Sequence, residues 1–360
     1  MSRVIMVMAG GTGGHIFPGL AVAEHMRAAG WEVVWMGARS GMEARIVPPR
    51  GYRMAWIRAR ALRGKGWLAR LLFPASLLWS FWESGLAVFR ERPDVVLGMG
   101  GYVAFPGGMM ASLLARPLAV HEQNAIAGLA NRVLAALADK AMVAFPGALK
   151  NAEWTGNPVR AEIAAMAAPE KRFGGRSGPL RLLVVGGSLG AQALNEAVPR
   201  ALALMRKGER PEVVHQAGEK HLEALRAGYA AAGVAGVAGE LVAFIDDMAR
   251  RYAEADLVLC RAGAITVAEL SAAGVAAILV PFPYAVDDHQ SANARFLAER
   301  DAAILLPQAQ LTPDRLAGLL RSLDRARLLE MARKARALGK PDAARVVAER
   351  CMALAEGAAP

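Results

Sequence analysis

Two glycine-rich turns are the features of the sequence that most suggest chemistry. The first runs from Gly10 to His15 (GGTGGH) and the second from Gly186 to Gly190 (GGSLG), each after an apolar stretch and before a helical pattern. Glycine lets backbone N–H groups come close to a ligand, and the N-terminus of a helix attracts anions. The two turns therefore predict binding of a phosphorylated ligand, although tight turns without a ligand are the alternative.

Neither turn carries the dinucleotide-binding fingerprint. Ile16 stands where the third glycine of the first turn would be. No acid ends the second strand of either half, because Met36-Gly37 and Gln216-Ala217 occupy the positions that hold a ribose in such sites. A dinucleotide-dependent dehydrogenase is therefore disfavoured.

His15 is the candidate catalytic base. It follows the flexible glycine run at the mouth of a helix, where a polar side chain can face a ligand. The positive end of a helix favours the neutral imidazole, which can accept a proton. The alternative is a histidine that only packs.

Two polar segments of the second half could hold a nucleotide sugar. The run 261–269 (RAGAITVAE) enters a helix, so its backbone donors suit phosphates, and Glu269 could accept hydrogen bonds from a ribose diol or be an ordinary solvated acid. The second segment runs from Asp287 to Ala294 (DDHQSANA). Asp287 and Asp288 lack a third metal ligand, so we expect helix capping there.

Short β-branched runs alternate with helical patterns in both halves, which is typical of parallel βαβ units. We expect strands at 4–8, 32–36, 94–97, 181–185, 212–215, 256–259 and 276–280. The fold class is therefore α/β, with two doubly wound parallel sheets. Because ligands bind beyond the carboxyl ends of such strands, we expect the site in a cleft between the halves.

The domain boundary is expected near residues 156–180. Pro169–Pro179 (PEKRFGGRSGP) is polar and bounded by prolines, which predicts a linker rather than an element. We place an N-terminal domain at 1–160 and a C-terminal domain at 161–340. The tail, about 341–360, has helical spacing and could pack on either domain.

Composition narrows the class of protein. The 360 residues carry 43 Lys and Arg against 32 Asp and Glu, a formal charge of +11. That charge suits an anionic membrane surface or a phosphorylated substrate, and no recognisable nucleic-acid-binding module accompanies it. The two cysteines, Cys260 and Cys351, form no metal-binding pattern, and the N-terminus reads as a strand rather than a signal peptide. We expect a cytoplasmic location.

The segment 67–90 is apolar but unsuited to spanning a bilayer. Its twelve uncharged residues between Arg70 and Glu83 would extend about 18 Å as a helix, less than a hydrocarbon core of about 30 Å. Trp79, Phe81 and Trp82 instead predict a patch that lies on the membrane surface, although an amphipathic core helix is the alternative. The basic anchors upstream would be Arg58, Arg60, Arg63, Lys65 and Arg70.

Seven motifs, in order along the whole chain, resemble those of the MurG family of bacterial cell-wall glycosyltransferases. They are GGTGGH (10–15), HEQN (121–124), GNPVR (156–160), GGSLGA (186–191), FIDDM (244–248), RAGAITVAE (261–269) and HQSANA (289–294). The resemblance implies a GT-B fold of two Rossmann-like domains, with the last helix returning to the N-terminal domain. It implies inverting transfer of N-acetylglucosamine from UDP-N-acetylglucosamine to the 4-hydroxyl of lipid I, giving lipid II at the cytoplasmic face of the bacterial cell membrane.

The resemblance also implies roles for individual residues. His15 would assist deprotonation of the acceptor hydroxyl, while Gly101, Tyr102 and Glu122 would lie on the acceptor side. The loop 100–108 departs from the family at Ala104-Phe105, where Ser-Gly is usual. Donor contacts are implied for Thr12, Gly13, Gly14, Asn124, Arg160, Ser188, Ile245, Ala264, Ile265, Thr266, Val267, Ala268, Glu269 and Gln290.

No cofactor and no metal are expected. The expected partners are UDP-N-acetylglucosamine, lipid I and the anionic inner-membrane surface, with the protein peripheral to it, and no nucleic acid. The alternatives are another GT-B lipid-acceptor glycosyltransferase, a UDP-sugar 2-epimerase, or a membrane protein that binds a nucleotide sugar without turning it over.

Overall fold

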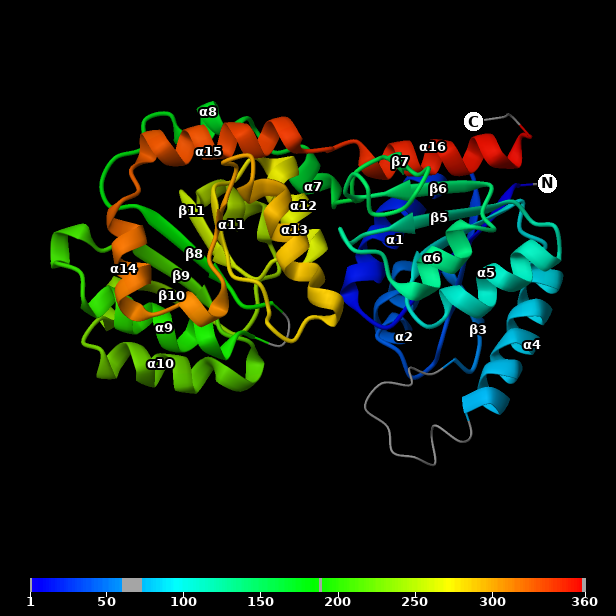
Figure 1. Cartoon of the computed structure of the whole chain (residues 1–360), viewed down its shortest axis with the longest axis horizontal. Coiled ribbons are helices and arrows are strands. Elements are labelled where there is room, and N and C mark those ends of the chain that lie inside the picture. Colours follow the sequence, from blue (N-terminus) through cyan, green and yellow to red (C-terminus); the bar gives the residue numbers. More distant parts are fainter. Residues whose placement is uncertain (1, 60–72, 188–189, 358–360) are drawn as a thin grey trace. The chain divides into compact units, whose positions relative to one another are not determined.

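The computed structural model describes residues 2–59, 73–187 and 190–357. The chain divides into two compact units, one made of Met1–Arg160 with Asp342–Pro360 and one of Ala161–Pro341 (Figure 1). Each unit contains one sheet in which every pair of neighbouring strands is parallel. The predicted α/β class with two parallel sheets is confirmed.

The sheet of the first unit has seven strands in the order β3-β2-β1-β4-β5-β6-β7. Their bounds are β1 Val4–Ala9, β2 Glu32–Gly37, β3 Arg53–Trp56, β4 Val95–Gly100, β5 Leu118–Glu122, β6 Lys140–Val143 and β7 Glu153–Trp154. β1 is central, with Met6 opposite Val34 on one side and Val96 on the other. Because β1 is buried on both faces, its sequence is apolar throughout rather than alternating.

Helices cover both faces of this sheet. One face packs Ile5 and Val7 against α1 (Gly13–Ala28) and α16 (Ala343–Ala355), and the other packs Met6 and Met8 against the helices of the middle of the unit. Those helices are α4 (Phe73–Glu91), α5 (Ala104–Leu113) and α6 (Leu129–Ala135), and α2 (Glu43–Ile46) follows β2. Alternate side chains of β1 therefore pack into two separate cores, one on each face of the sheet.

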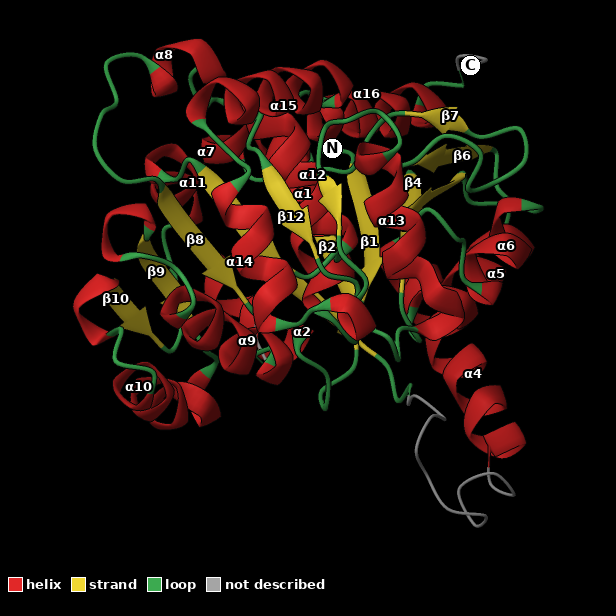
Figure 2. Ribbon diagram, turned by 60° about the vertical axis from the view of Figure 1, so that its left-hand side comes forward, coloured by secondary structure: helices red, strands yellow, loops and turns green. Residues whose placement is uncertain are grey.

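The second unit repeats this design with six strands in the order β10-β9-β8-β11-β12-β13. Figure 2 shows β8, β9 and β10 of this sheet side by side. The strands are β8 Arg181–Val185, β9 Glu212–Gln216, β10 Ala238–Val242, β11 Leu257–Cys260, β12 Ala277–Leu279 and β13 Ile304–Leu305. The helices are α7 Ala161–Ala164, α8 Pro169–Phe173, α9 Gln192–Ala203, α10 Leu222–Ala231, α11 Met248–Glu254, α12 Ala264–Ala273, α13 His289–Ala298, α14 Pro313–Arg321 and α15 Arg325–Leu338. Its main core joins Leu182 and Val184 of β8 to α9, α10 and α14.

Short 3-10 helices complete the chain. They are η1 Pro48–Arg50 in the first unit, and η2 Lys207–Glu209, η3 Glu219–His221, η4 Ala235–Val237, η5 Val286–Asp288 and η6 Gln308–Gln310 in the second.

The expected linker at Pro169–Pro179 was wrong, because this segment is docked on the second unit. Pro169 opens α8, where its fixed φ suits the first turn of a helix, and Phe173 is buried. The guanidinium of Arg172 donates to the backbone carbonyls of Tyr252 (3.2 Å) and Ala273 (2.8 Å). The polar residues and the proline of this segment therefore belong to a charged helix that is bound to the second unit, and not to a free linker.

The C-terminal helix α16 is held to the first unit by packing on α1 and by an ion pair. Arg350 donates from Nε (2.9 Å) and Nη2 (2.8 Å) to the carboxylate of Glu153 in β7, and Lys140 of β6 lies 3.0 Å from the same group. These donors lower the pKa of Glu153 to about 2, with the hydrogen bond from Arg350 as the largest cause. One carboxylate thus links α16 to the sheet edge.

No helix in the described ranges is both long enough and apolar enough to cross a membrane.

The Glu153–Arg350 pair should make the stability of the first unit depend on pH. A carboxylate whose pKa is lowered on folding stabilises fully above its ordinary pKa, here 4.5, and the stabilisation is lost as pH falls towards 2. We expect Glu153→Gln to lower the urea midpoint of unfolding at pH 6, and the gap from wild type to close as pH falls from about 4.5. Glu24→Gln, an exposed acid on α1, is the control. A gap that stays constant down to pH 3 would contradict the assignment.

Candidate functional site

The first glycine turn places His15 in the first turn of α1. Its ring nitrogen Nδ1 lies 3.2 Å from the carbonyl oxygen of Gly10 and 3.2 Å from the hydroxyl of Thr12. Because a carbonyl oxygen can only accept, the contact with Gly10 requires the proton on Nδ1. In the neutral ring, Nε2 then carries the lone pair that a general base needs.

The His15 ring rests on the end of β4. A Cβ added to Gly100 would lie 2.9 Å from Cδ2 and 3.1 Å from Nε2 of His15, and Gly100 has a φ of +101°. Gly101 is packed more tightly still, because an added Cβ would lie 2.2 Å from the carbonyl oxygen of Gly10. Glycine at both positions lets the two loops meet, so the structure brings Gly101 directly against the first turn.

A buried carboxylate that sequence reasoning missed joins these loops. Glu43, fully buried in α2, accepts the N–H of Gly11 at 3.1 Å with one oxygen. Its other oxygen accepts the N–H of Ala38 at 3.0 Å and the phenol of Tyr102 at 3.1 Å. The only signal in the sequence was an acid six residues beyond the end of β2. Glu43 therefore binds the first turn, the end of β2 and the loop after β4 together.

Tyr102 is held as a hydrogen-bond donor in this network. Burial, and secondly the neighbouring Glu43 carboxylate, raise the pKa of Tyr102. The phenol therefore keeps its proton at neutral pH and donates it to Glu43. The acceptor-side role of Tyr102 stays a prediction.

Glu122 is placed to hold a loop rather than to exchange a proton. It is buried, and its oxygens accept the N–H of Asn124 (2.8 Å), the side-chain amide of Asn131 (2.9 Å) and the N–H of Gly128 (3.3 Å). With several donors directed at the carboxylate, the structure favours a positioning role over the role of a base. Asn124, beside it, is fixed by the same carboxylate.

His121 ties the end of β5 to the motif 156–160. Its Nε2 lies 2.8 Å from the carbonyl oxygen of Gly156, and burial lowers its pKa to about 4. The ring is therefore neutral and donates to that carbonyl. Arg160, half-buried, ends this motif and the first unit.

In the second unit, the turn after β8 is fastened by an amide. Gln216 at the end of β9 donates to the carbonyl of Gly187 (2.9 Å) and accepts the N–H of Gly187 (3.1 Å). A Cβ on Gly190 would lie 2.2 Å from the carbonyl oxygen of Ala217, so this turn packs on the end of β9. Ser188, predicted to contact the donor, lies outside the described residues.

Glu269 is not a solvated helical acid. Its side chain in α12 is only 5% exposed, and the phenol of Tyr252 donates to it at 3.2 Å. Gly263 is the N-cap of α12, so the residues predicted to contact the donor form its first turns. Of these, Ala264 and Val267 are buried, while Ile265, Thr266 and Ala268 are half-buried.

Gln290 and Ile245 lie in the segments after β12 and β10. The Oε1 atom of Gln290 in α13 accepts the N–H of Phe282 at 2.9 Å, and Ile245 is buried. Asp288 takes the N-cap position of α13, but its carboxylate accepts the hydroxyl of Ser291 at 2.6 Å and no backbone N–H. The predicted helix capping was therefore wrong. Its left-handed backbone, with φ of 51°, differs from the extended conformation that aims a capping side chain inward.

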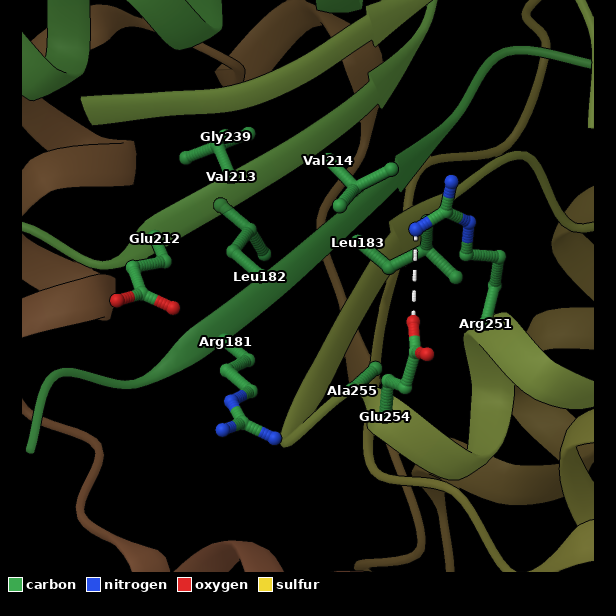
Figure 3. A pocket seen from close by; sticks show the side chains of 10 residues that line it. All are labelled: Arg181, Leu182, Leu183, Glu212, Val213, Val214, Gly239, Arg251, Glu254 and Ala255. Atoms are coloured by element: carbon green, nitrogen blue, oxygen red, sulfur yellow. Dashed lines mark hydrogen bonds and ion pairs between the residues drawn. The ribbon is translucent and has the colours of Figure 1, made fainter. Parts of the chain in front are cut away.

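In each unit the described residues predicted for catalysis, donor binding and the acceptor side thus lie at or beyond the carboxyl ends of strands, where parallel sheets bind ligands. A hollow of about 330 Å³ in the second unit does not belong to this set (Figure 3). It reaches Arg181 and Glu212, which open β8 and β9 at their amino ends. Figure 3 shows that Arg251 and Glu254 of α11 line it as an ion pair.

The predicted membrane patch is partly corrected. Trp79 and Trp82 are 50% and 63% exposed on α4, but Phe81 is half-buried, with its ring 5.8 Å from that of Phe105. Phe81 therefore packs on α5 and does not belong to the patch. Leu78 (70%) and Phe89 (63%) were missed and lie on the exposed face. We call Leu78, Trp79, Trp82 and Phe89 the α4 patch.

The basic anchors of this patch are only partly described. Arg58 lies with its guanidinium 5.4 Å from the ring centroid of Trp79 and 3.2 Å from the carboxylate of Glu83. Arg60, Arg63, Lys65 and Arg70 fall outside the described residues.

In the part of the chain that the structure describes, no group of three or more His, Cys, Asp or Glu side chains could hold a metal ion. Cys260 and Cys351 are both free thiols, and burial raises the pKa of each to about 12. Neither cysteine is suited to act as a nucleophile.

Comparison with known proteins decides the family. Residues 5–143 match the glycosyltransferase family 28 N-terminal domain, and residues 181–347 match the glycosyltransferase family 28 C-terminal domain. The chain belongs to glycosyltransferase family 28. The family 28 domains cover both units, so the predicted glycosyltransferase is confirmed.

Among its relatives is a protein of Aromatoleum aromaticum, 66% identical over 355 residues, which are 99% of each chain. Another, of Dechloromonas aromatica, is 61% identical over 356 residues, 99% of this chain and 100% of that protein. Both are named UDP-N-acetylglucosamine–N-acetylmuramyl-(pentapeptide) pyrophosphoryl-undecaprenol N-acetylglucosamine transferase.

Solved structures agree with this family 28 assignment. The crystal structure of Acinetobacter baumannii MurG is 40% identical and superposes with a TM-score of 0.85 over 97% of this chain and 99% of that one. The predicted membership of the MurG family and the GT-B fold are thereby confirmed. A putative UDP-N-acetylglucosamine 2-epimerase from Listeria monocytogenes has a TM-score of 0.65 over 99% of this chain and 98% of that one. At 14% identity, this likeness shows the fold alone.

Removing the Glu43 carboxylate should loosen the first unit. Glu43→Ala leaves the N–H groups of Gly11 and Ala38 and the phenol of Tyr102 without their acceptor. We expect a loss of about 1 to 3 kcal/mol in the free energy of unfolding, measured by urea denaturation. Glu43→Gln keeps the shape and one acceptor oxygen, so its loss should be smaller. With Glu24→Ala as the surface control, an equal midpoint for Glu43→Ala and the control would refute the role.

Proposed function

We propose that this chain transfers N-acetylglucosamine from UDP-N-acetylglucosamine to the 4-hydroxyl of lipid I, with inversion, giving lipid II and UDP in peptidoglycan synthesis. The observation that carries the proposal is 66% identity over 99% of both chains to a relative named for this transfer. Matches to both domains of family 28 support it, because both units of the enzyme are present.

The donor is proposed to bind the second unit at α12. The N-terminal turn of α12 presents backbone N–H groups and the positive end of the helix to the diphosphate, and buried Glu269 accepts from the ribose diol. Ile245 and Gln290 are proposed to contact the donor on this side. Donor contacts for Ser188, which lies outside the described residues, and for Thr12, Gly13, Gly14, Asn124 and Arg160 of the first unit stay predictions. A fixed cation and helix ends can offset the charge that builds up on departing UDP, so the proposal assigns no role to a metal.

His15 is proposed to take the proton of the acceptor hydroxyl. The hydroxyl attacks the anomeric carbon as the bond to UDP breaks, through a state with oxocarbenium character. With the ring proton on Nδ1 at the Gly10 carbonyl, the lone pair of the neutral ring is on Nε2, the atom proposed to receive the proton. Gly101 and Tyr102, against the same turn, are proposed to shape the acceptor side.

A second candidate, a UDP-sugar 2-epimerase, shares only the fold at 14% identity. Another lipid-acceptor glycosyltransferase would differ from the proposal in its acceptor. A protein that only binds the nucleotide sugar would not need a catalytic base. The orientation of the His15 ring favours catalysis over binding alone.

Product analysis tests the proposal. Incubation with UDP-N-acetylglucosamine and lipid I should release UDP and form lipid II, while omission of lipid I should give neither. His15→Ala should lower kcat by about 10² to 10⁴, because general-base assistance is lost, with little change in donor affinity by calorimetry.

His25→Ala, an exposed histidine on the same helix, is the control and should keep the wild-type kcat. If His15→Ala keeps a near-normal kcat but binds the donor more weakly, His15 contacts the donor and is not the base. Epimerised nucleotide sugar in the absence of lipid I would reject the transferase.

We also propose that the α4 patch binds the anionic cytoplasmic face of the bacterial cell membrane, so that the protein is peripheral there. Aromatic and aliphatic side chains at positions 78, 79, 82 and 89 share one exposed face of α4, and the chain carries a formal charge of +11. Apolar burial and attraction to anionic lipid act together at such surfaces.

Replacing both exposed tryptophans should separate membrane binding from stability. The double variant Trp79→Ser with Trp82→Ser should bind vesicles of anionic phospholipid more weakly in a sedimentation assay, while its melting temperature stays close to that of wild type. Leu204→Ser, an exposed apolar residue of the second unit, is the control. A large fall in melting temperature would show that the rings pack against protein, and unchanged vesicle binding would reject the patch.

A further inference from the structure

A hollow of about 370 Å³ lies in the first unit beyond the carboxyl ends of β2 and β3, and none of the predicted catalytic, donor-side or acceptor-side residues lines it. Its lining includes two arginines and one acid. The walls come from the end of β2, the end of β3 and α4: Ala38, Arg39, Ser40, Trp56, Arg58 and Glu83.

Arg39 is the cation of this hollow that lacks a counter-ion. Its guanidinium lies 5.1 Å from the ring centroid of Trp56, and within the described ranges it has no hydrogen bond or ion pair. Arg58 differs, because Glu83 neutralises it at 3.2 Å. A guanidinium stacked on an aromatic ring keeps its N–H edge available, in the fork geometry that fits phosphate oxygens.

The hollow is connected through Glu43 to the turn that carries His15. The N–H of Ala38 donates to Glu43, and the same carboxylate accepts the N–H of Gly11. β2 lies beside β1 with Met36 opposite Met8, so the ends of the two strands are about 5 Å apart. An occupant of the hollow therefore lies within about one or two strand spacings of the first turn.

On its other side the hollow reaches α4 through Glu83. The carboxylate of Glu83 accepts the indole N–H of Trp79 at 2.8 Å. Trp79 belongs to the α4 patch, so the hollow lies along the sheet end between His15 and the surface proposed to meet the membrane.

We propose that this hollow binds the diphosphate of the lipid-linked acceptor, with Arg39 as its principal ligand. The inference rests on the proposed function. In that acceptor the diphosphate joins the sugar to the lipid chain, so with the sugar at His15 and the chain at the α4 patch, the diphosphate must bridge them. The guanidinium of Arg39, which has no counter-ion among the described residues, lies on that route, and Ser40 in the same lining offers its hydroxyl as a further donor.

A membrane phospholipid could bring a phosphate to the same hollow, so the experiment has two arms. The first uses the full chain and a lipid I analogue with a short, water-soluble prenyl chain, without vesicles. Arg39→Ala should raise KM for this acceptor about 10- to 100-fold while kcat and the donor KM stay within about twofold of wild type. Arg39→Lys keeps the charge but not the forked guanidinium, so its acceptor KM should lie between those of wild type and Arg39→Ala.

The second arm measures binding to anionic phospholipid vesicles without acceptor, where Arg39→Ala should match wild type within about twofold. The control in both arms is Arg27→Ala, which removes a guanidinium stacked 4.6 Å over Tyr52 in the same unit, outside the hollow. It should leave both measurements unchanged.

Four results would overturn the assignment. An unchanged acceptor KM in Arg39→Ala with normal turnover would remove Arg39 from the acceptor site while leaving the proposed function intact. An equal rise in the acceptor KM for Arg39→Ala and Arg27→Ala would show that the effect comes from the loss of one positive charge and not from Arg39 itself. A loss seen only with vesicles would assign the phosphate to a membrane lipid. Absence of product from the wild-type chain would instead reject the proposed function on which the inference rests.

Discussion

The buried carboxylate of Glu43 is the constraint on which the first unit's site depends. A glycine turn that must approach a ligand leaves backbone N–H groups without partners, and a buried unpaired donor is costly. Glu43 accepts from Gly11, Ala38 and Tyr102, which come from three separate loops. Because the Glu43 carboxylate accepts hydrogen bonds from all three loops, it holds them together. His15 follows the first of these loops, so its position depends on this contact.

The second unit meets the same demand with a neutral group. Gln216 both donates to and accepts from Gly187, so the turn after β8 is fastened without adding charge. In both units one side chain from a neighbouring segment thus holds the glycine turn, a charged side chain in the first unit and a neutral one in the second.

The α4 segment links chemistry to the proposed membrane surface. Glu83 binds Trp79 on the exposed face and pairs with Arg58 at the end of β3. Its neighbour Phe81 points the other way and packs on Phe105. One helix thus presents an apolar surface outward while its Glu83 lines a hollow at the sheet end, where Arg39 has no counter-ion among the described residues.

Seven of the thirteen described strands, the two glycine turns, His15 at a helix start and the family motifs were readable from the sequence, because each depends on residues near one another in the chain. Side-chain partners were not. The role of Glu43 and the direction of Phe81 depend on residues that are distant in sequence and meet only on folding. The docking of Pro169–Pro179 was missed for the same reason, since the carbonyls that hold Arg172 lie about 80 to 100 residues away. Local pattern determined the elements, and tertiary packing decided which polar groups are buried, paired or available to a ligand.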